Sequence, residues 1–251
     1  MRETHAVQGG VIVGPCRHRP VEKRCASCIL DTSDYFAGLS ATAKLALQPA
    51  LSLKSFGRRK ILYAEGSPSQ HLYILLSGEV KVYKSLSHGH QQIHKMVSIP
   101  GDLVGCEDLF LDTHCSTAEC IDDVTVCYLR KERLHEVTRR HGEVSETLMR
   151  SMARNLNSYV RHIANLGQRK ALERVASYLV FLFQTHPEHN LRYGLLMQSL
   201  TRTELAEMLG ITQRTLIRSL KTLEGKRLIS LARDGFILHN LPALMRISEG
   251  R

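Results

Sequence analysis

The sequence predicts an α+β protein with an antiparallel β-roll, a long helix and a C-terminal winged helix-turn-helix. Three observations support this class. Short β-type runs separated by glycines fill the first half of the chain, an apolar heptad repeat follows, and two amphipathic segments joined by a glycine lie near the C-terminus. We expect four regions, at residues 1–34 (a cysteine-containing arm), 35–140 (the β-roll domain), 141–168 (the dimerisation helix) and 169–251 (the winged helix-turn-helix domain).

The arm and the roll differ in their hydrophobic pattern. Residues 1–34 show no clear period and are rich in Gly, Pro, Arg and Cys, so we expect an irregular arm. The run LSATAKLAL predicts a short helix capped by Ser40. The run HLYILLSGEVKVYK predicts two strands around Ser77 and Gly78, because Val80 and Val82 alternate with other residue types. Similar runs continue to TVCYLRK, and such a series is typical of an antiparallel barrel or roll.

Residues 143–167 predict one long helix. They contain no proline and carry apolar residues at intervals of three and four. A helix of ~25 residues is about 37 Å long. A narrow heptad seam is typical of a helix that pairs with another helix, so we expect a homodimer; packing on its own domain is the alternative. The predicted seam consists of Met149, Met152, Leu156, Tyr159, Ile163 and Leu166.

The C-terminal part predicts a helix-turn-helix followed by a hairpin. Thr201 and Glu204 have the spacing of a capping box, Gly210 ends the first helix, and Thr212 caps the second. The run LISLARDGFILHN predicts a hairpin that turns at Asp234–Gly235, which would form a wing. The second helix of such a motif enters the major groove of DNA. The residues expected to contact DNA are Thr201, Arg202, Gln213, Arg214, Thr215 and Arg218.

The charge distribution favours the same partner. The chain has a net charge of +10, and residues 150–251 hold 16 Lys and Arg against 7 Asp and Glu, whereas residues 1–149 hold 18 against 17. A cationic C-terminal part is expected to bind phosphates, here those of double-stranded DNA. No glycine-rich phosphate loop, paired catalytic carboxylates or nucleophile elbow is present, so we do not expect an enzyme. No apolar run approaches the ~20 residues of a membrane span, and we expect a cytoplasmic protein.

A β-roll, a pairing helix and a winged helix in this order resemble the CRP/FNR family of bacterial transcription regulators. The runs LYILLSGEVKVY, GDLVG, ALERVASYL and LTRTELAEMLGITQRTLIRSLKTLE carry the resemblance, which covers roughly residues 20–245. It implies a cyclic-nucleotide-binding-like roll, a homodimer, a palindromic operator and RNA polymerase as a partner. The family commonly has glutamate where Arg214 stands here. Because arginine donates to guanine, whereas glutamate accepts from cytosine, we expect a different operator half-site.

The resemblance also indicates which effector is excluded. The run GCEDLFLDTHCSTAE matches the phosphate-binding cassette of the cyclic-nucleotide branch, with Cys106 in the place of its glutamate and Cys115 in that of its arginine. A cyclic phosphate would lose its main cationic partner. We therefore expect no cAMP binding. Cys106, Cys115 and Cys120 are expected to be buried structural thiols.

The FNR-like branch, which responds to oxygen, instead implies a [4Fe–4S] cluster. Cys25 and Cys28 form a C-x2-C pair, and Cys127 matches the cysteine on the roll. Thiolates are the soft ligands that such clusters prefer. The third N-terminal cysteine of the branch is replaced by Asp34. The fourth ligand is therefore open: Cys16 is the favoured choice, and Asp34 is a harder and weaker alternative.

Two further alternatives remain for the function. A regulator without a cluster could use a cysteine thiol redox switch, or it could act constitutively. A cluster-bearing regulator would respond to oxygen, or to NO. FNR-like proteins can carry an acidic residue in the dimer seam, where this chain has Tyr159. We therefore expect the protein without a cluster to remain a dimer.

Overall fold

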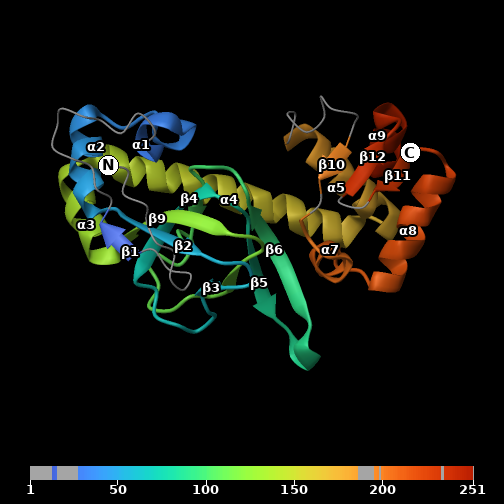
Figure 1. Ribbon diagram of the computed structural model, residues 1–251, viewed down its shortest axis with the longest axis horizontal. Helices are drawn as coiled ribbons and strands as arrows, with labels where there is room; N and C mark the ends of the chain where they lie inside the picture. The colour runs from blue at the N-terminus through green and yellow to red at the C-terminus, as the bar shows by residue number, and fades with distance from the viewer. Residues whose placement is uncertain (1–12, 16–27, 186–194, 198, 233–234, 251) are drawn as a thin grey trace, which may run out of the picture. The chain divides into compact units, whose positions relative to one another are not determined.

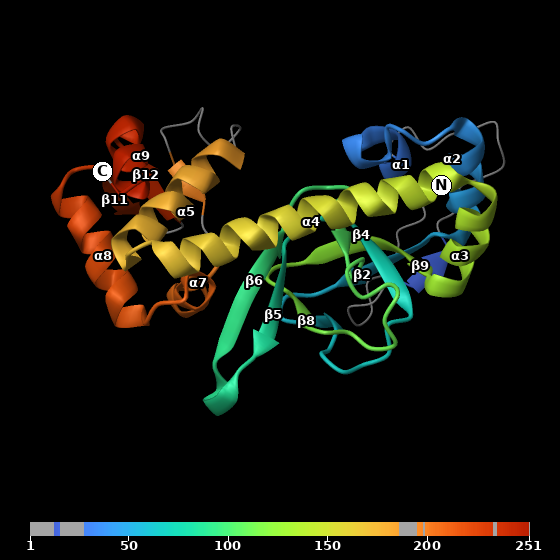
Figure 2. The same ribbon diagram turned by 180° about the vertical axis from the view of Figure 1, so that it is seen from behind.

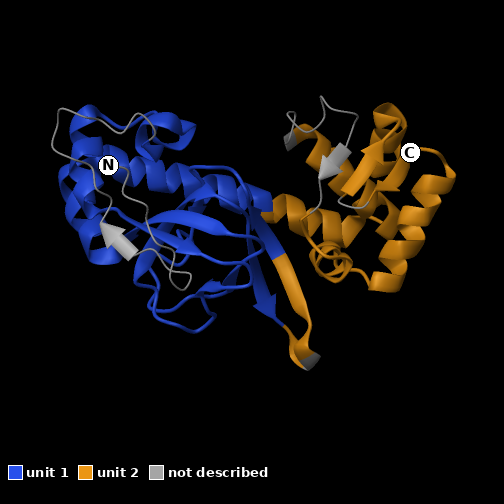
Figure 3. Cartoon of the chain, viewed as in Figure 1, with its two compact units in different colours: residues 1–85, 94–158 blue, residues 86–93, 159–251 orange. Residues whose placement is uncertain are grey.

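The computed structural model describes residues 13–15, 28–185, 195–197, 199–232 and 235–250. The chain forms two compact units (Figure 3). One comprises residues 1–85 and 94–158, and the other comprises residues 86–93 and 159–251. The long helix predicted over residues 143–167 is observed as α4 (Gly142–Gln168), and it contributes residues to both units.

Two antiparallel sheets build the predicted β-roll, which is confirmed. The first sheet has the order β1-β2-β9-β4-β7 and the second the order β3-β8-β5-β6. The strands are β1 (Val13–Pro15), β2 (Ser52–Phe56), β3 (Ile61–Tyr63), β4 (His71–Ser77), β5 (Val80–Ser85), β6 (Gln91–Val97), β7 (Leu103–Val104), β8 (Thr117–Cys120) and β9 (Val124–Arg130). Strand β9 lies between β2 and β4, so its residues occupy the middle of the first sheet.

The prediction of β5 assumed that buried and exposed residues alternate along the strand, but its first four residues are all buried. Val80 and Val82 are buried, but so is Lys81, whose ammonium group lies 3.4 Å from the Glu119 carboxylate on β8. Burial of a charged side chain is tolerated where an opposite charge accompanies it. The first four residues of β5 are therefore covered on both faces of the sheet, which the alternating sequence pattern did not predict.

Short helices precede, connect and follow the strands of the roll. They are α1 (Ile29–Thr32), η1 (Asp34–Phe36), α2 (Ala41–Leu47), η2 (Gln48–Ala50), η3 (Ser87–Gly89) and α3 (Lys131–Arg140). Ser40 caps α2 as predicted, because its hydroxyl accepts from the Ala43 amide at 3.2 Å. Figures 1 and 2 show α1 and α2 beside α3 and the first part of α4.

Helix α1 and helix η1 lie in or next to the segment expected to be irregular. The prediction was wrong for residues 28–34, because Ile29 and Leu30 are buried in the core and the Cys28 carbonyl accepts from the amides of Asp31 and Thr32 at 2.8 and 3.1 Å. A single turn of helix has no visible hydrophobic period. Packing, rather than intrinsic propensity, stabilises a helix this short.

The second unit holds the predicted helix-turn-helix and wing. Its elements are α5 (Ala171–Thr185), β10 (Leu195–Met197), α7 (Arg202–Leu209), α8 (Gln213–Gly225), β11 (Ile229–Ala232), β12 (Gly235–Leu238) and α9 (Leu241–Ser248). The sheet has the order β10-β12-β11. Strands β11 and β12 pair antiparallel, which confirms the hairpin, although Asp234 lies outside the described residues. Leu216, Leu220 and Leu223 of α8 are buried, as predicted.

Candidate nucleic-acid interface and sensory site

The first helix of the motif begins at the predicted capping box. The Glu204 amide donates to the Thr201 hydroxyl at 3.3 Å, while the Glu204 carboxylate accepts from the Thr201 amide at 2.9 Å and from its hydroxyl at 2.7 Å. Two amide donors at the helix terminus are thus satisfied reciprocally. The neighbouring Arg202 is exposed and available to a phosphate.

The turn between α7 and α8 is held by the backbone conformation of Gly210 and by hydrogen bonds from Arg174. Gly210 adopts a left-handed conformation with φ 60°, and a Cβ at this position would lie 2.8 Å from a Leu166 methyl carbon. Arg174 on α5 donates from its Nη1 to the carbonyls of Leu209 and Gly210, at 3.0 and 3.1 Å. These carbonyls at the end of α7 have no partner within the helix. Arg174 therefore fixes the turn from outside the motif, a role that a search for the motif alone does not find.

Helix α8 presents a polar and basic face at its N-terminal end. The Thr212 hydroxyl caps the helix by accepting from the Thr215 amide at 3.2 Å. Gln213, Arg214 and Arg218 are exposed, while Leu216 is fully buried. Residues four apart lie on the same face of a helix, so Arg214 and Arg218 point to the same side. Of the predicted contact residues of α8, Gln213 and the two arginines are therefore exposed on the side away from the core, whereas Thr215 is half-buried.

An apolar stripe runs along α4, but in a register different from the predicted seam. Met152 packs against the core of the roll, and Tyr159 and Leu166 are partly buried. Val160, which was not predicted, is exposed. The exposed apolar residues follow intervals of 4, 3, 4 and 3: Met149 (60% exposed), Ala153, Leu156 (65%), Val160 (55%) and Ile163 (67%). The apolar residues of this segment fit a second heptad register, through Ala153 and Val160, and the sequence alone could have indicated it.

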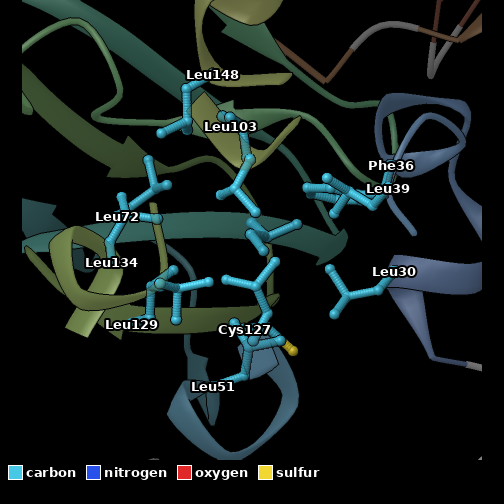
Figure 4. Packing of buried hydrophobic residues seen from close by; sticks show 14 of the residues in the cluster. Leu30, Phe36, Leu39, Leu51, Leu72, Leu103, Cys127, Leu129, Leu134 and Leu148 are labelled. Atoms are coloured by element: carbon cyan, nitrogen blue, oxygen red, sulfur yellow. The ribbon is translucent and has the colours of Figure 1, made fainter. Parts of the chain in front are cut away.

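Two of the four predicted cluster ligands are described, and both are buried in one hydrophobic cluster. Cys28 and Cys127 are each 5% exposed and belong to the core formed by α1, the first sheet, α3 and α4. Figure 4 shows Cys127 among leucines of these elements, including Leu30 of α1 and Leu129 of β9. Cys28 directly precedes α1, and Cys127 pairs with Leu53 and Ile74 across the sheet. The arm and the roll thus each bring one sulfur to the same core.

Of the other predicted ligands, only Asp34 is among the described residues. Cys16 and Cys25 lie outside the described residues. Asp34 is exposed in η1 and lines a groove with residues of α4, including Glu143, Glu146 and Arg150. In the parts of the chain that the structure describes, no three His, Cys, Asp or Glu side chains gather in a group that could hold a metal ion. Of the two alternatives for the fourth ligand, Asp34 fits the buried core less well than a thiol does.

A polar network surrounds Cys106 on the roll. The Asn155 amide of α4 donates to the Cys106 sulfur at 3.2 Å and to Glu107 Oε1 at 2.9 Å. Lys95 on β6 forms an ion pair with the same oxygen at 2.5 Å. Burial raises the pKa of Cys106 to about 12. Cys106, which replaces the expected glutamate, is thus held in a network with Asn155, whose amide also binds Glu107.

The remaining cysteines differ from one another in exposure. Cys120 is fully buried, and burial raises its pKa to about 12. Cys115 is exposed, which corrects the prediction of a third buried thiol; partial desolvation and the nearby Asp108 carboxylate raise its pKa. It lies in the loop between β7 and β8, next to the buried His114. None of the five described cysteines forms a disulfide bond.

The fold and the exposed basic face of α8 define the class of the protein: it is a DNA-binding transcription regulator and not an enzyme. A cyclic nucleotide-binding domain model matches residues 53–141, and a Crp-like helix-turn-helix domain model matches residues 173–247. The chain belongs to the CRP/FNR family of transcription regulators. No helix in the described residues has the length and apolar character required to span a membrane.

Named relatives fall into two functional groups. The chain is 25% identical over 195 residues to an anaerobic regulatory protein of Pasteurella multocida, covering 78% of this chain and 71% of the relative. It is 26% identical over 219 residues to a CRP-like cAMP-activated global transcriptional regulator of Mycobacterium tuberculosis, covering 87% and 97%. The solved structure of FixK2 from Bradyrhizobium japonicum is similar with a TM-score of 0.68 and 26% identity, covering 78% and 96%.

Proposed function

We propose that this regulator is a homodimer that senses oxygen or NO through a [4Fe–4S] cluster and binds a palindromic operator, with RNA polymerase as a partner. The observation that carries the proposal is the burial of Cys28 and Cys127 in one apolar core. Cys25 and Cys16 complete the proposed ligand set. Four thiolates suit an iron–sulfur cluster because they are soft anionic donors. The anaerobic regulator among the relatives supports this branch.

The residues around Cys106 argue against the cAMP branch. A cyclic phosphate needs a cation that is free to receive it. The lysines close to this segment are engaged, since Lys95 pairs with Glu107 at 2.5 Å and Lys84 pairs with Glu65 at 2.8 Å. Cys115, which stands in the place of the branch's arginine, carries no positive charge. We therefore do not assign cAMP as the effector, although the fold is that of a cyclic nucleotide-binding domain.

A direct thiol redox switch on the roll is the second candidate. Thiolates, not thiols, react with oxidants, so a redox cysteine needs a low pKa and access to solvent. Cys106 and Cys120 are buried with a pKa raised to about 12. Cys115 is accessible, but its pKa is also raised. Cys106, Cys115 and Cys120 are therefore poorly suited to this role, which favours the cluster.

The chain's own residues would carry the response to DNA. Cys28 connects to α1, and the buried side chains of Ile29 and Leu30 seat this segment on the roll. When bound, the cluster supplies a centre that oxygen or NO degrades. The state of the arm would then bias a two-state dimer whose recognition helices lie ~34 Å apart, one turn of DNA.

Anaerobic purification with an absorbance spectrum and an iron assay tests the proposal. We expect a brown protein that contains iron and bleaches in air. Cys28→Ser and Cys127→Ser should each lose iron, whereas Cys115→Ser, which exchanges an exposed thiol of the roll, should retain it. A colourless wild-type protein without iron would leave a regulator that is cluster-free, switched by a thiol or constitutive.

A further inference from the structure

The segment that follows Cys28 is continuously hydrogen-bonded up to Phe36. The Thr32 amide donates to the Cys28 carbonyl at 3.1 Å, the Ser33 amide to Ile29 at 3.1 Å, and the Phe36 amide to Ser33 at 3.0 Å. The Ser33 hydroxyl also caps η1 by accepting from the Tyr35 amide at 3.2 Å. Because α1 and η1 follow each other without a flexible link, a displacement of Cys28 would also displace Tyr35.

This segment sits on the turn that precedes β7. A Cβ added to Gly101 would lie 1.9 Å from the Ser33 hydroxyl oxygen, so only glycine permits this close approach. The turn itself is held on β4, since the Gly101 amide donates to the Leu75 carbonyl at 2.8 Å and the Leu75 amide donates to the Asp102 carbonyl at 2.9 Å. The turn at Gly101, on which the segment packs, is therefore a fixed part of the roll; we call this turn the seat of the segment.

Tyr35 connects this seat to α4. Its hydroxyl interacts with the Asp102 carboxylate, and Asp102 Oδ1 is buried without a hydrogen-bond partner among the described residues. The guanidinium carbon of Arg154 lies 4.6 Å from the centre of the Tyr35 ring, which is the geometry of a cation–π contact. Burial and the Asp102 carboxylate raise the pKa of Tyr35 to about 12, so the hydroxyl remains protonated at physiological pH.

From these contacts we infer that Arg154 is the positioning residue through which a change at Cys28 reaches α4, with Tyr35 as its contact on the arm. The inference rests on the proposed function in assigning the signal to the segment of Cys28. A second link, the hydrogen bond from the Ser40 hydroxyl to Glu143 at 2.6 Å, is exposed and lies near the start of α4. Arg154 contacts the segment much further along the helix.

Arg150 supplies a matched control. It lies one turn before Arg154 on α4, it is exposed, and it lines the same groove. Its guanidinium, however, donates to Glu146 of its own helix at 2.5 and 3.2 Å. Arg150→Gln and Arg154→Gln therefore remove the same charge from the same helix, but only Arg154→Gln removes the contact with Tyr35.

A double-mutant cycle on the full-length protein tests the inference. Operator affinity is measured with and without Cys28→Ser in three backgrounds: wild type, Arg150→Gln and Arg154→Gln. We expect Cys28→Ser to change affinity at least tenfold in wild type and in Arg150→Gln, and less than twofold in Arg154→Gln. Equal changes in all three backgrounds would overturn the inference, as would a wild-type background in which Cys28→Ser has no effect.

Iron content, measured on the same samples, separates the two proposals. Iron in the wild type together with equal changes in all backgrounds rejects the role of Arg154 and leaves the proposed function standing. No iron together with a change that disappears in Arg154→Gln rejects the cluster and retains the link. If Arg154→Gln lowers the urea midpoint, Arg154→Lys keeps a cation over the ring, and it should preserve most of the effect of Cys28→Ser.

Discussion

At the scale of single residues, Arg214 stands where the resemblance to the CRP/FNR family places a glutamate. It is exposed on the N-terminal part of α8, next to Gln213 and one turn before Arg218. A bidentate arginine discriminates one base pair, whereas a contact to phosphate has no base preference. The position of the two arginines on one face could be predicted from their spacing. The identity of the base could not, because it depends on the docked DNA.

The first prediction concerns Arg214→Ala. We expect a loss of about 1–3 kcal/mol in binding free energy that falls on one base position of each half-site and relaxes the preference there. Lys221→Ala, on a later and exposed turn of the same helix, should weaken binding uniformly across sequences. Affinity measured against a panel of single-base operator variants distinguishes the two. A uniform loss for Arg214→Ala would show that this side chain contacts only phosphate.

The second prediction concerns the thiols of the roll. Only the thiolate reacts with alkylating agents, and a pKa of about 12 leaves roughly one thiolate in 10⁴ at pH 8. Cys106 and Cys120 should therefore remain unlabelled in the folded protein, while Cys115 reacts, and reacts faster as pH rises. Mass spectrometry of peptides after brief alkylation measures this, with Cys115→Ser as the control. Rapid labelling of Cys106 in the native state would contradict it.

The polar network around Cys106 shows what a sequence hides at this scale. Asn155 and Cys106 are 49 residues apart, and no local pattern relates them. Sequence comparison located the substitution of the expected glutamate by Cys106. It did not indicate that Asn155, Glu107 and Lys95 engage one another around the replaced position. Contacts of this kind arise from the packing of α4 on the roll.

At the scale of elements, capped helices were predictable and uncapped short ones were not. The bounds of α7 and α8 follow from Thr201, Glu204, Gly210 and Thr212, all visible as local side-chain rules. Helix α1 has only two buried apolar residues and no side-chain cap, so no local sequence pattern predicts where it begins or ends. The apolar residues of α4 fit two heptad phases. The predicted seam follows one phase and the exposed stripe the other, and Met152 of the predicted seam packs on the core.

The third prediction addresses the turn between α7 and α8. Gly210→Ala should lower the free energy of unfolding by roughly 1–2 kcal/mol, because a residue with a Cβ is strained in the left-handed conformation. Operator affinity should fall with it, since this turn sets the angle of the recognition helix. The control is Gly225→Ala at the end of α8, where an added Cβ meets no atom within 4 Å. Urea denaturation followed by circular dichroism compares the two, and equal losses would contradict the argument.

At the scale of the whole molecule, the exposed apolar stripe on α4 is the surface that we propose contacts the second chain of the dimer. Met149, Leu156, Val160 and Ile163 are more than half exposed. Exposed apolar residues at heptad spacing are unfavourable in water and favourable against a second helix. The sequence predicted a seam through Met152 and Tyr159, and from the exposed stripe we propose that the seam passes through Val160 instead.

The fourth prediction tests this surface. Val160→Glu should convert the protein to monomers, because a carboxylate buried in an apolar seam loses its hydration without gaining a partner. Ser158→Glu introduces the same charge at an exposed position of the same helix, off the stripe, and should leave a dimer. Sedimentation velocity measures both. A dimeric Val160→Glu would reject the revised register and favour the original one through Tyr159.

The fifth prediction concerns removal of iron. The stripe contains no acidic residue that would repel its copy in a second chain. We therefore expect a chelator to bleach the protein without dissociating it, so that the switch acts by reorientation. Gel filtration before and after chelation checks this. An iron-free monomer would show that the cluster supports association itself.

The central place of β9 has a consequence for what can reach the protein's interior. Cys127 lies on the middle strand of a five-stranded sheet and beneath packed leucines. A tripeptide disulfide is too bulky to permeate such packing, whereas a diatomic gas needs only the brief gaps of side-chain rotation. If Cys127 holds the proposed cluster, the packing of the roll would select oxidants by size before any difference in their redox potentials applies.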